Sequence, residues 1–405
     1  MPDSRHPGAQ GRTPPARDIH DSARILVVDD TEANRDLLVR RLQREGHSSA
    51  VAENGRVALD LLMHEAFDLV LLDIRMPVMD GYELLDRIKA NDTLQHLPVI
   101  VISAQDDADS VVKAIVMGAD DYLPKPFNPH ILRARIGASL ARKRLRDREQ
   151  LYAQSLEREL EIARRIQSEF LPRQLPRPAG WELAVWFQPA RRVAGDFYDA
   201  FELPGGRRTA IVVADVCDKG VGAALFMALL RSLMRVLAAR ILTPGTDVAT
   251  GAQNLIDGVN DYIARTHDHA NMFATVFLAV LDPDSGEMVY VNGGHEPPVI
   301  VGDGGVRARL APTGPAVGLL PDRHFAARAE VLARGEMLVV FTDGVTDAHD
   351  AEGTPFPDQA LLEALTAPAI SAADMVSRIR EGVQGHVQDA QQFDDITLFV
   401  AHHQA

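Results

Sequence analysis

The stretch IVVADVCDKGVGAALFMALL, residues 211–230, decides the fold of the larger part of this chain. Its first half is a short Val-rich run that predicts a buried strand, and its second half is an apolar helix. The strand ends on Asp215, and Gly220 and Gly222 would let the helix pack closely behind it. A buried carboxylate is costly unless a cation neutralises it, so we expect Asp215 to be a metal ligand.

Other predicted strands of the same region also end on acidic residues. Oxygen ligands without a His or Cys pattern favour Mg²⁺ or Mn²⁺ over Zn²⁺. Two such ions can activate a bridging water for in-line displacement at phosphorus, which is hydrolysis without a covalent enzyme intermediate. The acidic residues are Asp196 and Asp199, Asp215 and Asp218, Asp343 and Asp347, and Asp394 and Asp395.

Three further residue types in this region could serve the chemistry. Cys217 is the only cysteine, which excludes internal disulfides, and a small thiol in a strand-to-helix turn is more often a packing residue than a nucleophile. His295, in GGHEPP, could position a substrate, but we favour a structural role in a turn. Arg191 and Arg192 are candidates for anchoring a phosphate.

The first part of the chain has a different pattern, in which short Val, Ile and Leu runs alternate with helical segments. This alternation predicts an α/β domain, residues 23–140, with a doubly wound five-stranded parallel sheet. Three carboxylates at the strand ends would bind Mg²⁺, while a lysine and a hydroxyl suit phosphoryl oxygens, so Asp73 can be the nucleophile of an aspartyl phosphate. The strand-end residues are Asp29, Asp30, Asp73, Ser103 and Lys125.

Residues 131–171 predict one long charged helix, of which 141–171 form a linker. An approximate 4,3 spacing of apolar residues, broken by Glu159, favours a short coiled coil and a homodimer; a connector that lies on its own domain is equally compatible. Three prolines in LPRQLPRPAGWE end the helix. The seam residues are Tyr152, Leu156, Ala163, Ile166 and Phe170.

The last region, residues 172–405, predicts a multidomain arrangement with a second, α+β domain. The segment VFLAVLDPDSGEMVYVN, residues 276–292, reads as an antiparallel hairpin with DPDSG as its turn. Residues 1–22 are rich in Pro, Gly and charge and predict a disordered tail. We also predict helices over 218–240, 246–266 and 370–388.

Composition limits the class of protein. The net charge of −15 argues against non-specific nucleic-acid binding. We find no apolar run of about 18 residues and no signal-peptide pattern, so we expect a cytoplasmic protein without membrane contact.

Residues 24–140 resemble the response-regulator receiver domain, through VVDD, LLDIRMPVMDG, VISA and GADDYLPKPF. The resemblance implies that Asp73 accepts a phosphoryl group from a histidine kinase, with Mg²⁺ on Asp29, Asp30, Asp73 and the carbonyl of Arg75. It further implies that Ser103 and Lys125 contact the phosphoryl group. Tyr122 would turn inward when Ser103 moves, and the Lys125-Pro126 bond would be cis.

Residues 160–403 resemble the PPM-type serine/threonine phosphatases of the SpoIIE branch, through AGDFYD, ADVCDKGVGAALFMA, VNGGHEPP, FTDGVTDA and FDDITLFV. The resemblance implies an α-β-β-α sandwich and a phosphoserine or phosphothreonine substrate on an anti-sigma-factor antagonist. Departures at Ala194, Cys217-Asp218 and Gly293 remove no ligand. The implied ligands of two Mn²⁺ or Mg²⁺ ions are Asp196, Asp215, the carbonyl of Val216, Asp343 and Asp394, with Asp199 and Asp395 as outer candidates.

The sequence therefore predicts a response regulator whose output is a metal-dependent protein phosphatase, gated through the helix by phosphorylation at Asp73. The alternative from another class is a non-catalytic partner-switching scaffold that sequesters a regulator. A DNA-binding regulator is disfavoured, because the chain is acidic and we find no helix-turn-helix segment after the first domain.

Overall fold

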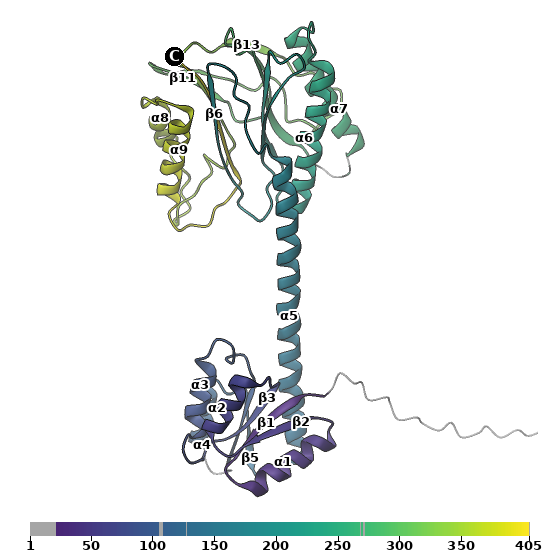
Figure 1. The fold of residues 1–405 in the computed structure, drawn as a ribbon, viewed down its shortest axis with the longest axis vertical. Coiled ribbons are helices and arrows are strands. Elements are labelled where there is room, and N and C mark those ends of the chain that lie inside the picture. Colours follow the sequence, from purple (N-terminus) through teal and green to yellow (C-terminus); the bar gives the residue numbers. More distant parts are fainter. Residues whose placement is uncertain (1–21, 105–107, 127, 268, 270–271, 405) are drawn as a thin grey trace, which may run out of the picture. The chain divides into compact units, whose positions relative to one another are not determined.

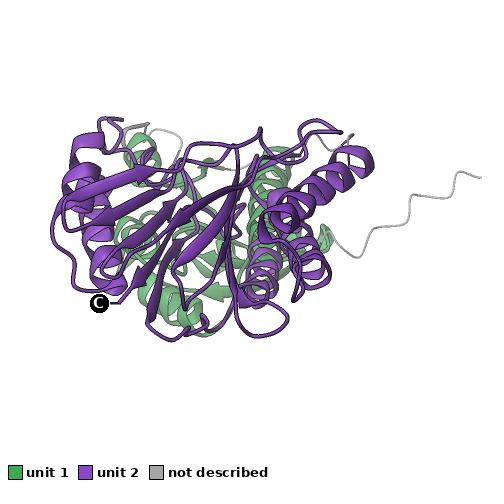
Figure 2. Ribbon diagram, turned by 90° about the horizontal axis from the view of Figure 1, so that it is seen from above, with its two compact units in different colours: residues 1–155 green, residues 156–405 purple. Residues whose placement is uncertain are grey.

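The computed structural model describes residues 22–404 except 105–107, 127, 268 and 270–271 (Figure 1). The predicted tail thus lies outside the described residues, apart from Ser22. The chain forms two compact units, one up to Ser155 and one from Leu156, which Figure 2 colours separately. Each is described by itself.

The first unit contains the predicted five-stranded parallel sheet, in the order β2-β1-β3-β4-β5. Buried residues of α2, α3 and α4 pack on one face of it and those of α1 and α5 on the other, which confirms the doubly wound fold. Its elements are β1 (Arg24–Val28), α1 (Glu32–Arg44), β2 (Ser48–Ala52), α2 (Gly55–His64), β3 (Leu69–Asp73), α3 (Gly81–Lys89), β4 (Val99–Ala104), α4 (Ala108–Val116) and β5 (Asp121–Lys125).

The last helix of the first unit and the predicted linker are a single helix, α5 (Pro129–Phe170). Leu132, Ile136 and Leu140 anchor its first turns in the core of the first unit. The helix ends directly before the proline-rich segment, as the sequence predicts. No break occurs near residue 141.

The second unit has two five-stranded sheets, in the orders β13-β10-β9-β8-β7 and β12-β11-β14-β15-β6, and every pairing between these strands is antiparallel. Their strands are β6 (Trp181–Gln188), β7 (Phe197–Glu202), β8 (Thr209–Val216), β9 (Ala274–Leu281), β10 (Glu287–Gly293), β11 (Val299–Gly302), β12 (Gly305–Arg309), β13 (Arg328–Val331), β14 (Met337–Phe341) and β15 (Ile396–His403). The predicted hairpin is β9 and β10, paired from Leu281 with Met288.

Helices cover the outer face of each sheet, which gives the expected α-β-β-α sandwich (Figure 2). One apolar core lies under α6 (Val221–Ile241) and α7 (Val248–Thr266). A second lies under α8 (Asp358–Thr366) and α9 (Ala372–Val387), and a third fills the layer between the sheets.

Helix α6 also has the length and composition of a membrane span, the one such helix among the described residues. About a third of this apolar stretch, 33%, is buried inside the fold. Met227, Leu230 and Met234 are fully buried against α7 and the sheet.

Candidate metal and phosphoryl-transfer sites

The acidic site of the second unit follows from the alternation of side chains along β8. Val212 and Ala214 belong to the core beneath α6 and α7, whereas Ile211 and Val213 belong to the core between the sheets. Because successive side chains point to opposite faces, Asp215 continues the row that points between the sheets. The carboxylate therefore lies at one end of the inter-sheet layer.

Two threonines of the opposite sheet reach the same end. Thr342, directly after β14, and Thr397, in β15, each donate a hydroxyl hydrogen bond of 2.8 Å to Oδ2 of Asp196. Asp196 is only 1% exposed. Asp343 directly follows Thr342, and Asp394 lies just before β15. Strand ends from both sheets therefore bring carboxylates to the same end of the inter-sheet layer.

Three carboxylates of this group have raised pKa values, with burial as the main cause in each. Burial, and then the charge of Asp215, raises the pKa of Asp196 well above its usual range. Burial is also the main cause that raises the pKa of Asp215 to about 6. For Asp343, burial followed by the charges of Asp215 and Asp394 raises the pKa to about 7. A group of this kind binds protons or cations near neutral pH.

Asp394 and Asp395, although adjacent, do different things. Oδ2 of Asp394 lies 2.8 Å from Nζ of Lys219. The two oxygens of Asp395 accept backbone hydrogen bonds of 2.7 Å from Ala190 and Gly195, so this side chain fixes the loop that leads to Asp196. Asp395 thereby acts on the position of another carboxylate.

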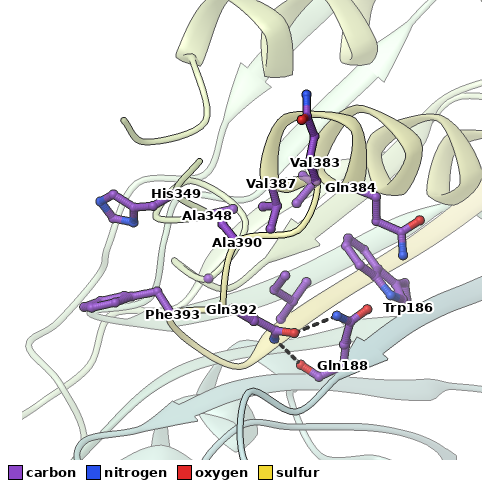
Figure 3. A pocket seen from close by; sticks show the side chains of 13 residues that line it. Trp186, Gln188, Ala348, His349, Val383, Gln384, Val387, Ala390, Gln392 and Phe393 are labelled. Atoms are coloured by element: carbon purple, nitrogen blue, oxygen red, sulfur yellow. Dashed lines mark hydrogen bonds between the residues drawn. The ribbon is translucent and has the colours of Figure 1, made fainter. Parts of the chain in front are cut away.

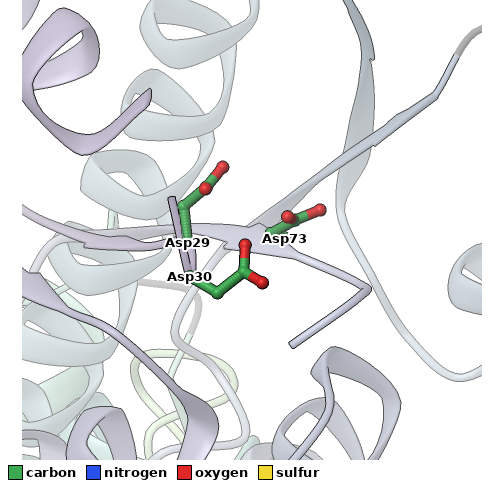
Figure 4. A group of neighbouring side chains, drawn as sticks. All are labelled: Asp29, Asp30 and Asp73. Atoms are coloured by element: carbon green, nitrogen blue, oxygen red, sulfur yellow. The ribbon is translucent and has the colours of Figure 1, made fainter. Parts of the chain in front are cut away.

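The acidic site of the first unit is more compact. One carboxylate oxygen from each of Asp29, Asp30 and Asp73 lies within 4.8 Å of the other two (Figure 4). Among the described residues, no other cluster of three or more His, Cys, Asp or Glu side chains is this close. Nζ of Lys125 lies 2.9 Å from Oδ2 of Asp29 and 2.8 Å from Oδ2 of Asp73. The pKa of Asp73 is raised by burial, against the opposing effect of Lys125.

Both sites fit divalent cations by the chemistry of their donors. Oxygen ligands alone, several of them buried, are what Mg²⁺ and Mn²⁺ bind. In the first unit, Oγ of Ser103 is also buried and has no hydrogen-bond partner among the described residues, as expected of a group that meets an incoming oxygen.

Two known protein families match this chain, each within one of its two units. The family model of the response regulator receiver domain matches residues 25–137, and that of stage II sporulation protein E (SpoIIE) matches residues 205–404. The chain joins a receiver domain to a SpoIIE-type phosphatase domain.

Relatives agree with each half. Protein IcfG of Synechocystis sp. is 42% identical over 262 residues, which are 60% of this chain and 41% of IcfG. Response regulator MprA of Mycolicibacterium vanbaalenii is 44% identical over 119 residues, or 29% of this chain and 51% of MprA. The chain thus spans about half or less of these relatives. The SiaA-PP2C domain of Pseudomonas aeruginosa shares the fold, with 18% identity, a TM-score of 0.53, and coverage of 63% of this chain and 99% of that domain.

Within the SpoIIE-type domain, the structure does not bring Asp199 to the other carboxylates. In β7, Phe197 faces the core under α6, so Asp199, two residues on, faces that helix as well. There it accepts hydrogen bonds of 2.6 and 2.8 Å from Arg235 and lies 3.0 Å from Arg231. Asp199 is therefore an ion-pair residue, and its predicted role as an outer metal ligand is wrong.

The carbonyl of Val216 and the side chain of Cys217 lie beside the site. A Cβ at Gly195 would be 2.9 Å from the Val216 oxygen, so that carbonyl faces the residue before Asp196. Sγ of Cys217 accepts a hydrogen bond of 3.1 Å from the backbone of Phe273, and burial raises the pKa of the thiol. This supports the packing role.

His295 and Arg192 have contacts within the fold that do not involve a phosphate site. Nδ1 of His295 lies 2.9 Å from the Thr275 hydroxyl, and burial lowers its pKa to about 3, so the ring is neutral and structural. Arg192 pairs with Glu157 and Glu161 of α5 and is not directed to a phosphate site by any contact of its own. Arg191 is exposed.

In the receiver domain, the structure also places Tyr122, the Lys125-Pro126 bond and Arg75, while the inward turn of Tyr122 stays a prediction. Tyr122 is 36% exposed and lies under the guanidinium of Arg135, 4.9 Å from its ring centre. The Lys125-Pro126 bond is cis, as predicted. Arg75 lies two residues after Asp73, beyond the end of β3, and its carbonyl remains a predicted ligand.

Sequence reasoning missed four residues of the SpoIIE-type site: Thr342, Thr397, Lys219 and Gln167. The two threonines stand in strand rows that are otherwise apolar, and this was the available signal. Gln167 of α5 clamps the loop before Asp196, since its amide donates to the Ala194 carbonyl at 2.6 Å and accepts from the Ala194 N–H at 2.9 Å. No local pattern marks that contact.

Proposed function

We propose that this protein is a response regulator whose output is metal-dependent hydrolysis of phosphoserine or phosphothreonine on a protein. The observation that carries the proposal is the meeting of Asp196, Asp215, Asp343 and Asp394 at one end of the inter-sheet layer, where burial and mutual charge raise the pKa of the first three. Such a group is unfavourable unless cations offset it.

These residues, with the carbonyl of Val216, would hold two Mn²⁺ or Mg²⁺ ions. The ions would supply an activated water and would stabilise charge on the phosphoryl oxygens. The chain's own task is positioning. Thr342 and Thr397 fix Asp196 through hydrogen bonds, and Asp395 fixes the preceding loop through Ala190 and Gly195.

In the receiver domain, we propose that Asp73 takes a phosphoryl group from a histidine kinase. A carboxylate oxygen of Asp73 forms the new bond to phosphorus while the bond from phosphorus to the kinase imidazole nitrogen breaks. Lys125 and Ser103 would meet the phosphoryl oxygens, and Asp29, Asp30, Asp73 and the Arg75 carbonyl would hold Mg²⁺.

We propose that this phosphorylation gates the phosphatase through α5. Support comes from the two ends of that helix, each within its own unit. Near its start, Leu132 and Ile136 pack in the receiver core, and near its end Gln167 holds Ala194, two residues before Asp196. A change in the helix at either end can therefore bias a loop that carries a ligand.

The proposed substrate, from the resemblance to SpoIIE-type domains, is a small anti-sigma-factor antagonist. We place the protein in the cytoplasm, where a histidine kinase's phosphoryl group and such a regulator are available. A homodimer through α5 belongs to the same proposal.

The test is phosphate release by the 405-residue chain from p-nitrophenyl phosphate and a phosphoserine peptide, in Mn²⁺ and in chelator, with and without acetyl phosphate. Release that requires metal and changes with acetyl phosphate in wild type but not in Asp73→Asn is the expected result. An identical response of wild type and Asp73→Asn would refute gating.

Substitution of Asp343 distinguishes the enzyme from the alternative, a non-catalytic scaffold. An enzyme with Asp343→Asn should lose at least about a hundredfold of its release rate, since one metal ligand is gone. A scaffold would keep its action in cells with the same substitution.

A further inference from the structure

A cavity of about 280 Å³ lies beside the SpoIIE-type carboxylate site, between the end of α9, strands β6 and β15, and the loop after β14 (Figure 3). Trp186, Val383 and Val387 form apolar walls. The volume is below the roughly 300–1,000 Å³ of sites that enclose whole drug-sized ligands, so it suits a single side chain better.

The cavity adjoins the two loops that carry Asp343 and Asp394. Gly344 and Phe393, which both line it, are the chain neighbours of Asp343 and Asp394. A Cβ at Gly344 would lie 1.9 Å from the carbonyl oxygen of Asp395, so the two loops are in direct contact at this point. A group bound in the cavity would therefore lie within a few residues' reach of a phosphoryl group at the carboxylates.

The loop between α9 and β15 is held in place by an amide pair. Nε2 of Gln392 donates to the carbonyl of Gln188 at 2.8 Å, and its Oε1 accepts from Nε2 of Gln188 at 2.6 Å (Figure 3). The same Nε2 also donates to the carbonyl of Asp394 at 2.7 Å. These bonds tie the cavity wall to the backbone of Asp394 itself. The cavity is thus preformed with the site.

The lining carries no carboxylate, lysine or arginine, in contrast to the site next to it. Four of its 13 residues are glutamines and one is His349, so its apolar surface is the part formed by Trp186, Val383, Val387, Ile396, the two alanines and Phe393. Phe393 stands at the edge, 57% exposed, with Nζ of Lys219 4.4 Å from its ring centre and the ring of His349 at 5.3 Å. An exposed aromatic ring beside a cavity without carboxylates, lysines or arginines favours an apolar guest and disfavours a charged one.

We propose that this cavity binds an apolar side chain of the substrate protein, close in sequence to the phosphorylated serine or threonine. The inference rests on the proposed phosphatase function and adds a determinant of specificity to it. The phosphoryl group goes to the carboxylate site, and an apolar residue such as Leu or Phe enters between α9 and the loop after β14.

The experiment uses phosphoserine peptides in which Leu, Phe or Asp replaces one position at a time on either side of the phosphoserine. The 405-residue chain hydrolyses each in Mn²⁺, and every rate is divided by the same variant's rate with p-nitrophenyl phosphate. Wild type should prefer Leu or Phe over Asp at one position by about tenfold in kcat/KM, the factor expected for burying one such side chain.

Two variants and one matched control test the assignment to this cavity. Ala390→Leu fills it and should abolish the preference, and Gln384→Lys, on an exposed residue of its rim, should shift the preference toward Asp. Ala373→Leu, on an exposed residue of the same helix away from the cavity, should keep the wild-type preference.

Two results would overturn the inference. One is wild type that hydrolyses p-nitrophenyl phosphate but shows no preference at any position; the other is Ala390→Leu that keeps the preference. A wild type that releases no phosphate from p-nitrophenyl phosphate in Mn²⁺ would instead contradict the proposed function, and the cavity's role with it.

Discussion

At the scale of single residues, Asp343 shows what the carboxylate site costs the protein without metal. Its pKa of about 7 in the folded chain lies above the ordinary value of 3.8, mainly because of burial and the charge of Asp215. The folded protein therefore binds more protons than the unfolded chain between these values. The contribution of Asp343 to the stability of the metal-free protein is therefore greatest below about pH 3.8 and is lost as pH rises through about 7.

This predicts that Asp343→Asn stabilises the metal-free protein at about pH 8, because it removes one buried negative charge. The melting temperature in chelator should rise by a few °C, since about 1 kcal/mol corresponds to about 2–4 °C at this domain size. The difference from wild type should shrink at about pH 5. In Mn²⁺ the order should reverse, because wild type gains stability from bound metal and the variant gains less. A variant that melts below wild type in chelator at both pH values would contradict this account.

Cys217 gives a second prediction at this scale. Its sulfur accepts a backbone hydrogen bond and its pKa is raised by burial, so little thiolate forms near neutral pH. Cys217→Ala should keep phosphate release within about twofold and cost about 1 kcal/mol of stability. Assay with p-nitrophenyl phosphate and a thermal melt check both. Loss of activity in a variant that melts normally would show that the thiol has a role in the chemistry.

The candidate metal ligands could be predicted from the sequence, because acidic residues stand at or next to the ends of apolar runs that predict strands. Asp199 was wrongly grouped with Asp196 as a ligand, because the sequence analysis did not predict that Asp199 lies in a strand, β7. Once β7 (Phe197–Glu202) is known, Asp199 falls on the face of Phe197, under α6, whereas Asp196 precedes the strand. Thr342 and Thr397 stand out as polar residues in apolar strand rows, but a local pattern does not tell which residue they contact. Their bonds to Asp196 and the Asp395 clamp join segments far apart in the chain.

At the scale of elements, the long periodic segments were predictable and the short polar ones were not. Helices α6, α7 and α9 lie within three residues of their predicted bounds. Strands such as β12, with the sequence GVRAR, and β13, with RAEV, are short and only partly buried, so they carry no clear alternation of apolar residues. Helix α8 has nine residues and was missed for the same reason of length.

Helix α5 gives the prediction at this scale, through Gln167. Its amide satisfies both backbone groups of Ala194 in a buried setting, and removing it leaves them unpaired at a cost of about 1–3 kcal/mol. Gln167→Ala should therefore loosen the loop that carries Asp196 and weaken Mn²⁺ binding by about tenfold or more. Titration of Mn²⁺ against phosphate release and against melting temperature measures this. Ser168→Ala, on the next and exposed residue, is the control and should leave both unchanged.

At the scale of the whole molecule, one helix, α5, carries both the proposed route to the phosphatase and the proposed seam for a second copy. Tyr152, Leu156 and Ile166 of α5 are 72%, 46% and 52% exposed. Apolar side chains at 4,3 spacing that face solvent are stabilised when an identical helix covers them. Because the same helix begins in the receiver core, pairing of two copies and phosphorylation at Asp73 would influence each other's equilibrium.

Glu159 provides the sharpest test of that pairing, because it interrupts the seam at a position where an apolar residue would contact the partner. Glu159→Leu should strengthen self-association of the 405-residue chain by about tenfold or more, and Leu156→Glu should weaken it, as measured by sedimentation equilibrium. Gln154→Glu, exposed on α5 but off the seam, controls for charge and should match wild type. If all three variants associated as wild type does, α5 would act as a connector within one chain, and any signal from Asp73 would reach the phosphatase without a second copy.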